Sequence, residues 1–523
     1  MPLSLQKSSF FLLFSVGSLG VLAWSPFNLW PVLAFSLGFL IERLFNSSSL
    51  KECAFLAWIW TWGLNVSTLY WVGNSLFIQP WRFGWLWPFC TFGLTGVLAL
   101  YGALLGILVF YGRRFFWKNS WLGYGLGFTV IYSVLEWLKG HLFTGLPWNL
   151  TAYIWSAYLP LAQGAAFVGS YAWSLVTILF LTIPGVLFLR NKKKADIFWG
   201  MGLQVGLFAA GWFLGQDRFW PQETNYQPGV VLRLVQPSIP QEDKHDPQLL
   251  QQNWDLLNQL SARPCTLPHP VTHILWPEGG ICWTLSKDSL SKLPQTLQTT
   301  SDPIPVLTGA GYLSPEGDVF NSMVWLKGGQ RFFFYHKHHL LPFGEYIPLR
   351  RLLDRFLPAW TLQKITAGTR DYSFGMPRPV CQLEGLPPFR MSICYEGIFP
   401  LRESKKASEA EWIFNATNDA WFGNSIGPYQ HLANVQFRAI EEGIPLVRVA
   451  NNGISAIFDG YGRCLASLTL NERGTLDTLL PKPAKKRPYP SSNLIFYLWV
   501  WLFALSVPWP PKKTLHDMLP GDS

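Results

Sequence analysis

Eight apolar segments constrain the fold of this chain more than any other feature of its sequence. A transmembrane helix needs about 20 consecutive apolar residues, because the hydrocarbon core of a bilayer is about 30 Å thick. Segments of roughly that length lie at about 9–27, 29–44, 53–72, 85–112, 120–139, 164–189, 195–215 and 492–510. We therefore predict a membrane domain of seven transmembrane helices over residues 1–215 and an eighth transmembrane helix at 492–510.

The composition also indicates a membrane protein. Only 14% of the residues are charged, 16% are aromatic and 28 are Trp, as expected for a chain with aromatic belts at both bilayer interfaces. The first segment also fits a secretory signal peptide, because Lys7 precedes its apolar core and Ala23-Trp24-Ser25 follows it. A second apolar segment begins immediately afterwards, which favours a membrane span over a cleaved leader.

The positions of the basic residues predict the topology. The chain has 41 Lys and Arg against 31 Asp and Glu, a net charge of +10, but these residues form no single stripe that would bind nucleic acid. The connecting segments on one side contain Lys7; Arg43 and Lys51; Arg113, Arg114 and Lys118; Arg190, Lys192, Lys193 and Lys194; and Lys512 and Lys513. The short segments on the other side contain little beyond Arg82 and Lys139. The positive-inside rule then predicts that both termini, with a tail at 511–523, are cytoplasmic and that residues 216–491 lie outside.

Glu136 is the charge inside a predicted span that most requires an explanation, because an intramembrane carboxylate is costly and usually faces a partner or water. We interpret it as an interfacial residue beside Lys139, with a substrate contact as the alternative. The loop that follows, 144–149, combines turn-forming residues with Trp148. This loop could line a lipid entrance, with Trp148 as a supporting or substrate-binding residue, or it could be an ordinary interfacial loop.

Short β-rich runs alternate with helical stretches from about residue 228, which predicts an α/β layered domain over 228–480. The predicted strands are 230–236, 272–278, 305–312, 322–327, 331–337, 390–396, 412–417, 446–450, 455–458 and 464–468. Apolar residues recur at helical spacing over 247–261 and 429–442. The Pro- and Lys-rich stretch 481–491 is predicted to be the linker to the last span.

Glu278 and Lys337 each close a predicted strand of this domain, Cys394 follows the run 390–393 near the end of another, and together the three could form a catalytic site. A carboxylate in a water-poor pocket can act as the base that a thiol nucleophile needs. Lys337 would supply a positive charge that favours the thiolate and stabilises a tetrahedral oxyanion. Each residue alone has an ordinary interpretation, such as a buried core thiol for Cys394. Three strand-end positions in one domain instead predict nucleophilic catalysis.

The histidines near Lys337 give weaker evidence for a functional site. His336, His338 and His339 suggest a metal site, but no carboxylate or Cys ligand stands at a complementary spacing. We expect no metal there and expect these histidines to pack around Lys337.

The seven cysteines contain no CxxC pair. A Cys265–Cys282 or Cys381–Cys464 disulfide is conceivable if the domain is extracytoplasmic, because disulfides persist in oxidising compartments.

The strand-end motifs resemble those of the nitrilase superfamily, whose Glu–Lys–Cys triad they match in order and spacing. The matching motifs are Trp276-Pro277-Glu278, Lys337-His338-His339-Leu340-Leu341-Pro342-Phe343-Gly344-Glu345, Cys394-Tyr395-Glu396, Asn418-Asp419-Ala420-Trp421-Phe422-Gly423 and Gly427-Pro428-Tyr429-Gln430-His431. The resemblance covers about 228–480 and implies an α-β-β-α sandwich. With eight apolar segments around it, the chain is similar to the membrane-embedded branch of this superfamily that acylates bacterial lipoproteins.

This resemblance implies an N-acyltransferase of the bacterial inner membrane without a cofactor. It would transfer a fatty acyl chain from a phospholipid, favouring phosphatidylethanolamine and its sn-1 chain, through a thioester on Cys394. The acceptor would be the free α-amino group of the N-terminal S-diacylglyceryl cysteine of a diacylated apolipoprotein, in the last step of lipoprotein maturation. Glu345 would hold Lys337 or move protons, and Tyr395 and Glu396 would shape the acyl site. We expect a monomer.

Two alternatives remain. A membrane-tethered nitrilase or amidase would use the same triad on a soluble amide. A transporter with an extracytoplasmic sensor domain is less consistent with spans that contain almost no charge and show no clear inverted repeat. The segment 346–362 mixes apolar residues with Arg and could be an interfacial arm or a surface helix.

Overall fold

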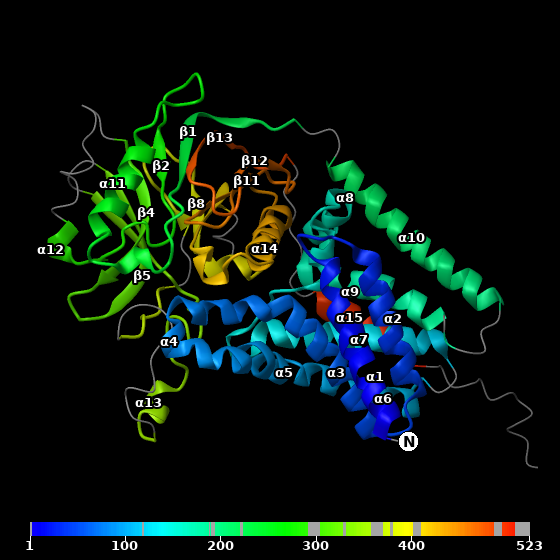
Figure 1. Cartoon of the computed structure of the whole chain (residues 1–523). Coiled ribbons are helices and arrows are strands. Elements are labelled where there is room, and N and C mark those ends of the chain that lie inside the picture. The colour runs from blue at the N-terminus through cyan, green and yellow to red at the C-terminus, as the bar shows by residue number, and fades with distance from the viewer. Residues whose placement is uncertain are drawn as a thin grey trace, which may run out of the picture.

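The structure is a computed structural model that describes residues 3–117, 120–187, 189, 194–219, 223–290, 304–327, 331–356, 370–376, 380–400, 409–485 and 494–507. The predicted tail at 511–523, most of the predicted linker at 481–491 and the end of the predicted arm at 346–362 lie outside the described residues. The described chain forms a helical part and an α/β domain that lie against each other (Figure 1).

A helix occupies each of the eight predicted apolar segments. These helices are α1 (Leu3–Leu19), α2 (Trp30–Asn46), α3 (Leu50–Leu69), α6 (Leu100–Phe115), α7 (Trp121–His141), α9 (Gly164–Leu187), α10 (Lys194–Phe219) and α15 (Leu494–Ser506). By length and composition, three stretches among the described residues are apolar enough to cross a membrane: Pro80–Phe115, Gly164–Leu187 and Lys194–Arg218. Phe10–Ala23 and Leu494–Ser506 are shorter apolar helices. The number of spans therefore stays a prediction.

Local sequence explains where some of these helices begin and how closely they pack. The Ser49 hydroxyl accepts a hydrogen bond from Glu52 N at 3.2 Å and caps α3, which satisfies one of the unpaired N–H groups at a helix start. Gly17 of α1 and Gly63 of α3 lie where the two helices cross, and a Cβ at either position would collide with the backbone of the other helix. Small residues of this kind permit the close helix contacts on which membrane helix packing depends.

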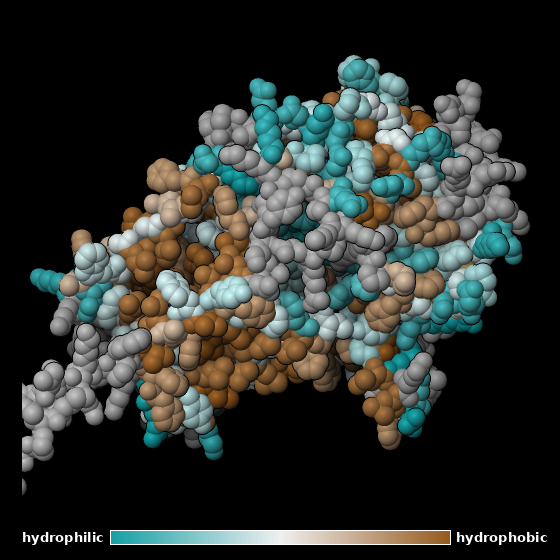
Figure 2. Space-filling model, turned by 180° about the vertical axis from the view of Figure 1, so that it is seen from behind, coloured by the Kyte–Doolittle hydropathy of each residue, from teal (hydrophilic) through white to brown (hydrophobic). Residues whose placement is uncertain are grey.

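Apolar side chains cover the outside of the helical part, whereas polar side chains gather on the α/β domain (Figure 2). Among the exposed apolar residues, Phe35 of α2, Phe55 of α3 and Phe213 of α10 are more than half exposed, at 64%, 52% and 70%. A large exposed apolar surface marks a contact with membrane or protein. The distribution is that of a chain whose helices face lipid.

The α/β domain contains two sheets packed face to face. One sheet has the strand order β13-β1-β2-β4-β5-β6, with β3 paired to β4, and the other has the order β12-β11-β10-β9-β8-β7. The first comprises β1 (Tyr226–Gln236), β2 (His273–Leu275), β3 (Thr284–Leu285), β4 (Val306–Leu313), β5 (Val319–Lys327), β6 (Arg331–His336) and β13 (Gly474–Pro481). The second comprises β7 (Val380–Cys381), β8 (Phe389–Ile393), β9 (Trp412–Thr417), β10 (Leu446–Ala450), β11 (Ser455–Phe458) and β12 (Cys464–Leu468).

Three apolar layers hold this sandwich together. Leu234 of β1 and Met391 of β8 belong to the core between the two sheets. The outer face of the first sheet packs on α11 (Leu250–Ser261), which contributes Leu257. The outer face of the second sheet packs on α14 (Gly427–Glu442), which contributes Val435. The predicted α-β-β-α sandwich is therefore confirmed, and its central strands are buried on both faces, as expected for sheets covered on both sides.

Several details differ from the sequence-based expectations. The strand predicted at 272–278 is limited to β2, and β3, β7 and β13 were not predicted. All seven cysteines are free, so neither Cys265–Cys282 nor Cys381–Cys464 forms a disulfide in the structure. Glu136 is buried, and its Oε1 accepts hydrogen bonds from the backbone N and Oγ1 of Thr151, each at 2.8 Å. This carboxylate therefore fixes the loop after α7 rather than facing solvent.

A cluster of apolar side chains joins the two parts of the molecule. We call it the junction cluster, and its buried members are Leu69, Trp71, Trp148, Tyr395 and Ile398. Hydrogen bonds reinforce this junction, because Trp148 Nε1 donates to Gln430 Oε1 at 2.8 Å and Tyr395 Oη donates to Gly145 O at 2.7 Å. The loop after α7 is thus fixed directly against the residue that follows Cys394.

Candidate active site

Glu278 enters the site from the end of β2. Gly279 has a φ of +58°, a conformation that glycine adopts without the steric cost of a Cβ, and it turns the chain directly behind the carboxylate. Glu278 Oε1 accepts a hydrogen bond from Asn321 Nδ2 at 2.8 Å, and Oε2 accepts one from the backbone N of Asn418 at 3.0 Å. Both oxygens are therefore oriented by neighbours from β5 and from the end of β9.

Lys337 follows β6 and lies between two carboxylates. Its side chain is 2% exposed, and its Nζ is 3.7 Å from Glu278 Oε1 and 2.9 Å from Glu345 Oε2. Asn321 Nδ2 also donates to Glu345 Oε1 at 2.8 Å, so one amide connects the two acids. Burial disfavours the ammonium, but the charges of Glu345 and Glu278 outweigh that effect and raise the pKa of Lys337. The site therefore contains a permanent cation.

Cys394 lies where β8 ends and a short 3-10 helix (Cys394–Ile398) begins. Its φ of +49° places a residue that has a Cβ in the left-handed region. Burial and the nearby Glu278 raise the pKa of Cys394 to about 12, against the opposing effect of Lys337. At neutral pH the resting sulfur is consequently a thiol, and it needs a base to become a nucleophile.

Glu396 holds the Cys394 turn against the segment that follows Lys337. Its Oε1 accepts hydrogen bonds from the backbone N–H groups of His338 and His339 at 2.8 and 3.0 Å. Its Oε2 accepts one from Tyr335 Oη at 2.9 Å and one from Ile393 N at 2.8 Å. The side chain is fully buried. With four donors around it, this carboxylate positions the backbone of the site.

A buried network of His431, Asp419 and Arg448 supports the backbone of Cys394. The His431 ring lies within hydrogen-bond distance of Cys394 O, at 3.2 Å from Nε2, and of Asp419 Oδ1, at 3.0 Å from Nδ1. Arg448 Nη2 donates to Asp419 Oδ2 at 2.6 Å. Burial opposes ionisation of Asp419, but Arg448 and His431 hold the pKa of that carboxyl below its usual range. The Cys394 backbone therefore rests on an ion pair.

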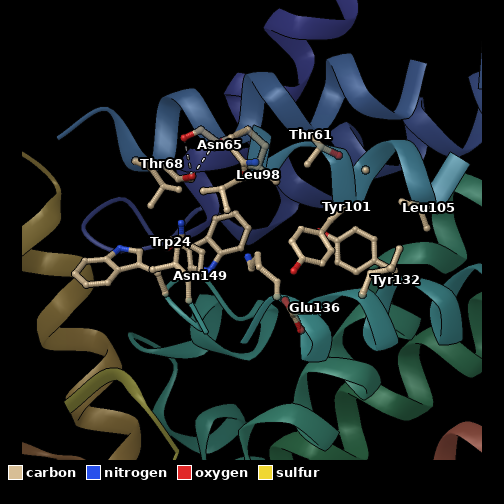
Figure 3. Close-up of a pocket in the computed structure, with 17 residues that line it drawn as sticks. Trp24, Thr61, Asn65, Thr68, Leu98, Tyr101, Leu105, Tyr132, Glu136 and Asn149 are labelled. Carbon is tan, nitrogen blue, oxygen red and sulfur yellow. Dashed lines mark hydrogen bonds between the residues drawn. The ribbon is translucent and has the colours of Figure 1, made fainter. Parts of the chain in front are cut away.

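A cavity of about 70 Å³ lies beside the junction cluster, within the helical part (Figure 3). Residues of α3, α6 and α7 line it, among them Leu105 and Glu136, and the loop after α7 closes it with Trp148 and Asn149. Tyr101 and Tyr132 lie on one side of Glu136 in this view, and Trp24 lies toward the other end (Figure 3). Trp148 thus borders both the cavity and the cluster that contains Tyr395.

The structure brings most of the predicted site residues into one place. Lys337 forms ion pairs with Glu278 and Glu345, and the Cys394 thiol is within their electrostatic reach. Tyr395 and Trp148 lie on the side of the site that faces the helices, whereas Glu396 points into the protein. Sequence reasoning assigned no role to Asn321, Asn418, Asp419, His431 or Arg448. Four of these lie in or beside quoted motifs or on neighbouring strands, but nothing local to Asn321 indicated its position.

Comparisons with known proteins identify two domains and a family. Residues 16–183 match the apolipoprotein N-acyltransferase N-terminal domain, and residues 232–483 match the carbon-nitrogen hydrolase domain. The apolipoprotein N-acyltransferase of Rhodopseudomonas palustris is 32% identical over 489 residues, which cover 90% of this chain and 89% of that protein. The chain belongs to the apolipoprotein N-acyltransferase family. The Rickettsia typhi member is 31% identical over 473 residues, covering 90% of this chain and 91% of that protein.

A solved structure is also similar to part of this chain. It is the amidase from Nesterenkonia sp. AN1, which is 18% identical and covers 48% of this chain and 93% of its own, with a TM-score of 0.33.

Membership of the apolipoprotein N-acyltransferase family establishes the class of activity. The protein is a membrane N-acyltransferase that acts in the N-acylation of lipoproteins. Its carbon-nitrogen hydrolase domain carries the site described above.

Proposed function

We propose that this enzyme transfers acyl chains by a ping-pong reaction through a thioester on Cys394. The observation that carries the proposal is the buried group of Glu278, Lys337 and Glu345 beside a thiol at a strand end. Glu278 is the base, Cys394 is the nucleophile, and Lys337 stabilises the oxyanion. Glu345 holds Lys337 in place.

In the first half-reaction Glu278 removes the proton from Cys394 Sγ, and the thiolate attacks the ester carbonyl of a phospholipid. Lys337 neutralises the oxyanion of the tetrahedral intermediate. The ester C–O bond then breaks, the lysophospholipid oxygen takes the proton from Glu278, and an acyl thioester remains. A thiol whose pKa is about 12 makes an adjacent base necessary, because almost no thiolate forms spontaneously at neutral pH.

In the second half-reaction the free α-amine of an S-diacylglyceryl cysteine attacks the thioester. Glu278 accepts a proton from the amine nitrogen as the new C–N bond forms, and that proton returns to the Cys394 sulfur when the C–S bond breaks. The products are an N-acylated lipoprotein and the resting thiol. Both half-reactions use the same three side chains, so each half depends on Cys394.

Phosphatidylethanolamine is our proposed donor, and the cavity in the helical part supports a lipid donor. Its lining is mostly apolar, and Leu69 and Trp148 belong both to this lining and to the junction cluster that contains Tyr395. An acyl chain entering between α3, α6 and α7 would leave its ester near the strand end. Apolar walls would also protect the thioester from water.

We further propose the topology that the basic residues predict. Eight helices would span the inner membrane, both termini would be cytoplasmic, and the domain at 228–480 would lie on the periplasmic side of a monomeric enzyme. The exposed apolar surface of the helical part supports a membrane position. This topology places the Cys394 thiol at the outer leaflet, where a lipoprotein amine can reach it.

The deciding experiment is intact-protein mass spectrometry after incubation with phospholipid alone. A fatty-acyl adduct on Cys394 is expected for the wild type, and transfer of the label should follow when a diacylated lipopeptide is added. Cys394→Ala should lose both the adduct and the transfer. The matched control is Cys464→Ala, because Cys464 is an exposed thiol on β12.

Two results would contradict the proposal. Normal transfer by Cys394→Ala would remove the thiol from the mechanism. An adduct that forms with a soluble amide but never with phospholipid would instead favour a membrane-tethered amidase.

A further inference from the structure

A second buried lysine lies beside the triad. Lys244 belongs to a 3-10 turn (Asp243–His245) that follows β1, and its side chain is 3% exposed. Its Nζ donates a hydrogen bond to the main-chain oxygen of Glu278 at 2.9 Å. The ammonium also lies 3.1 Å from the position that a Cβ on Gly279 would occupy. Lys244 therefore contacts the turn that presents the proposed base.

The turn that carries Lys244 is itself fixed. Asn253 Nδ2 of α11 donates to Asp243 O at 3.1 Å, and the His245 ring lies 3.2 Å from Cys282 O through its Nδ1. Just upstream, Gln241 Oε1 accepts a hydrogen bond from Asn418 Nδ2 at 2.7 Å. The backbone from which the Lys244 side chain extends is therefore held on both sides.

Lys244 is unusual because its charge is buried without a carboxylate of its own. Within the part of the chain that the structure describes, Lys244 Nζ donates its hydrogen bond to a neutral carbonyl oxygen, and Lys244 forms no ion pair. Burial lowers the pKa of Lys244, and Cys282, Glu278 and Cys394 are the groups that oppose this effect. An isolated buried ammonium is costly, so its position requires a reason.

The charges of the site supply that reason. Glu278, Lys337 and Glu345 form a largely buried set with two negative charges and one positive charge. Asp419 also acts electrostatically on Cys394, but it is paired with Arg448. The buried carboxylate of Glu396 accepts hydrogen bonds from backbone N–H groups instead. The set of Glu278, Lys337 and Glu345 therefore has one excess negative charge, which one further cation would balance. Lys244 has the required positive charge, and it lies against the main chain of Glu278.

We propose that Lys244 is a positioning residue for the base, whose ammonium fixes the Glu278 turn and balances the excess negative charge around Cys394. This inference rests on the proposed function, because it takes Glu278 as the base and Cys394 as the nucleophile. Lys337 remains the cation that favours the Cys394 thiolate directly. Lys244 acts on the reaction through Glu278 and through the electrostatic potential at the sulfur.

The test measures how fast Cys394 is alkylated by iodoacetamide as a function of pH, in the full-length enzyme in detergent without substrate. The alkylation rate reports the thiolate fraction. Removing a nearby positive charge disfavours the thiolate, so Lys244→Met and Lys244→Gln should react roughly tenfold more slowly at each pH below the thiol pKa, a shift of about one pH unit. Lys244→Arg keeps the charge and should react at close to the wild-type rate.

A purely structural role predicts a different pattern. Loosening the turn would expose the sulfur and speed its alkylation, and Lys244→Gln, which keeps a hydrogen-bond donor, would behave like the wild type. The matched control is Lys327→Met, because Lys327 is a half-exposed lysine of the same domain that pairs with Glu384. In this control, Cys394 should be alkylated at the wild-type rate. Gel filtration checks that each variant is folded. If Lys244→Met does not fold, the comparison of Lys244→Gln with Lys244→Arg still tests the proposal.

The proposal is overturned if Cys394 in folded Lys244→Gln is alkylated at or above the wild-type rate. It is also overturned if Cys394 is alkylated as slowly in Lys244→Arg as in Lys244→Gln. In acyl transfer, Lys244→Gln should lower kcat about tenfold and leave KM for phospholipid unchanged, because Lys244 touches the base and not the lipid. The alkylation readout needs no donor or acceptor. Its failure is therefore distinguishable from a failure of the thioester mechanism, which the acyl adduct tests separately.

Discussion

The helical part and the α/β domain bury polar groups for different purposes. In the helices, a buried carboxylate such as Glu136 holds a loop through the two hydrogen bonds that its Oε1 accepts from Thr151. In the α/β domain, buried charges converge on one strand end, where Lys337 lies between Glu278 and Glu345. Low dielectric surroundings strengthen such interactions and penalise any group that loses its partner. In the mechanism proposed above, the helical part places the substrate, and the α/β domain concentrates the charges that react with it.

The largest effect is expected from removing the cation of the reactive region. Lys337→Met leaves Glu278 and Glu345 without their shared partner and removes the oxyanion stabiliser, so acyl transfer should fall by about 10²–10³. The measurement is single-turnover acylation with labelled phospholipid. Lys327→Met is the matched control on the exposed side of β5. A variant that retains a tenth of the wild-type rate would show that Lys337 is not the oxyanion partner.

Breaking the Asp419–Arg448 ion pair should have the second-largest effect, a loss of unfolding free energy that depends on pH. The pKa of Asp419 is lowered in the folded protein, so its stabilising effect is complete above the unfolded pKa of about 3.9 and is lost as the pH falls through the lower folded value. Asp419→Asn should decrease the free energy of unfolding by about 3 kcal/mol at pH 7. Thermal unfolding should show this difference shrinking below about pH 4.

The control for that measurement is Asp255→Asn, because Asp255 is exposed on α11. It should leave the unfolding temperature unchanged at both pH values. A difference between wild type and Asp419→Asn that stays constant down to pH 3 would argue against the ion pair.

Glu396→Gln tests the contact between the Cys394 turn and the Lys337 segment. An amide has one acceptor oxygen where the carboxylate has two, so it leaves Ile393 N and Tyr335 Oη facing an NH₂ group. The expected cost is about 2 kcal/mol of unfolding free energy, measured by thermal unfolding, with a parallel loss of acylation rate. Glu316→Gln, at an exposed turn between β4 and β5, is the control. Full activity in Glu396→Gln would mean that the turn holds its geometry without this clamp.

The smallest effect is expected where the two regions touch. Tyr395→Phe removes the hydrogen bond to Gly145 O but keeps the ring in the junction cluster, so the expected loss is about 1 kcal/mol. Acyl transfer from long-chain phospholipid should fall about fivefold, because the loop that borders the cavity loosens. Tyr497→Phe on α15 is the control, since Tyr497 is 71% exposed. An unchanged rate would show that the loop is held by packing alone.

The sequence predicted those elements whose signal is local. The apolar spacing of residues 247–261 and 429–442 predicted α11 and α14 within a few residues, and the motifs at 278, 337 and 394 identified side chains that the structure brings together. The strand β13 was missed because it is defined by its pairing with β1, which is distant in sequence. The role of Glu396 was also hidden, since it binds the backbone of His338 across 58 residues. Non-local hydrogen bonds leave no pattern in the sequence around either partner.

The backbone at Cys394 has a consequence for how such an enzyme can change. A left-handed φ costs roughly 1–2 kcal/mol for a residue with a Cβ, and the φ of Cys394 is +49°. Glycine adopts that conformation freely. Selection for heat resistance alone would therefore favour glycine at position 394. If Cys394 is the nucleophile that we propose, the demand for acyl transfer keeps a sulfur in a backbone conformation that disfavours it.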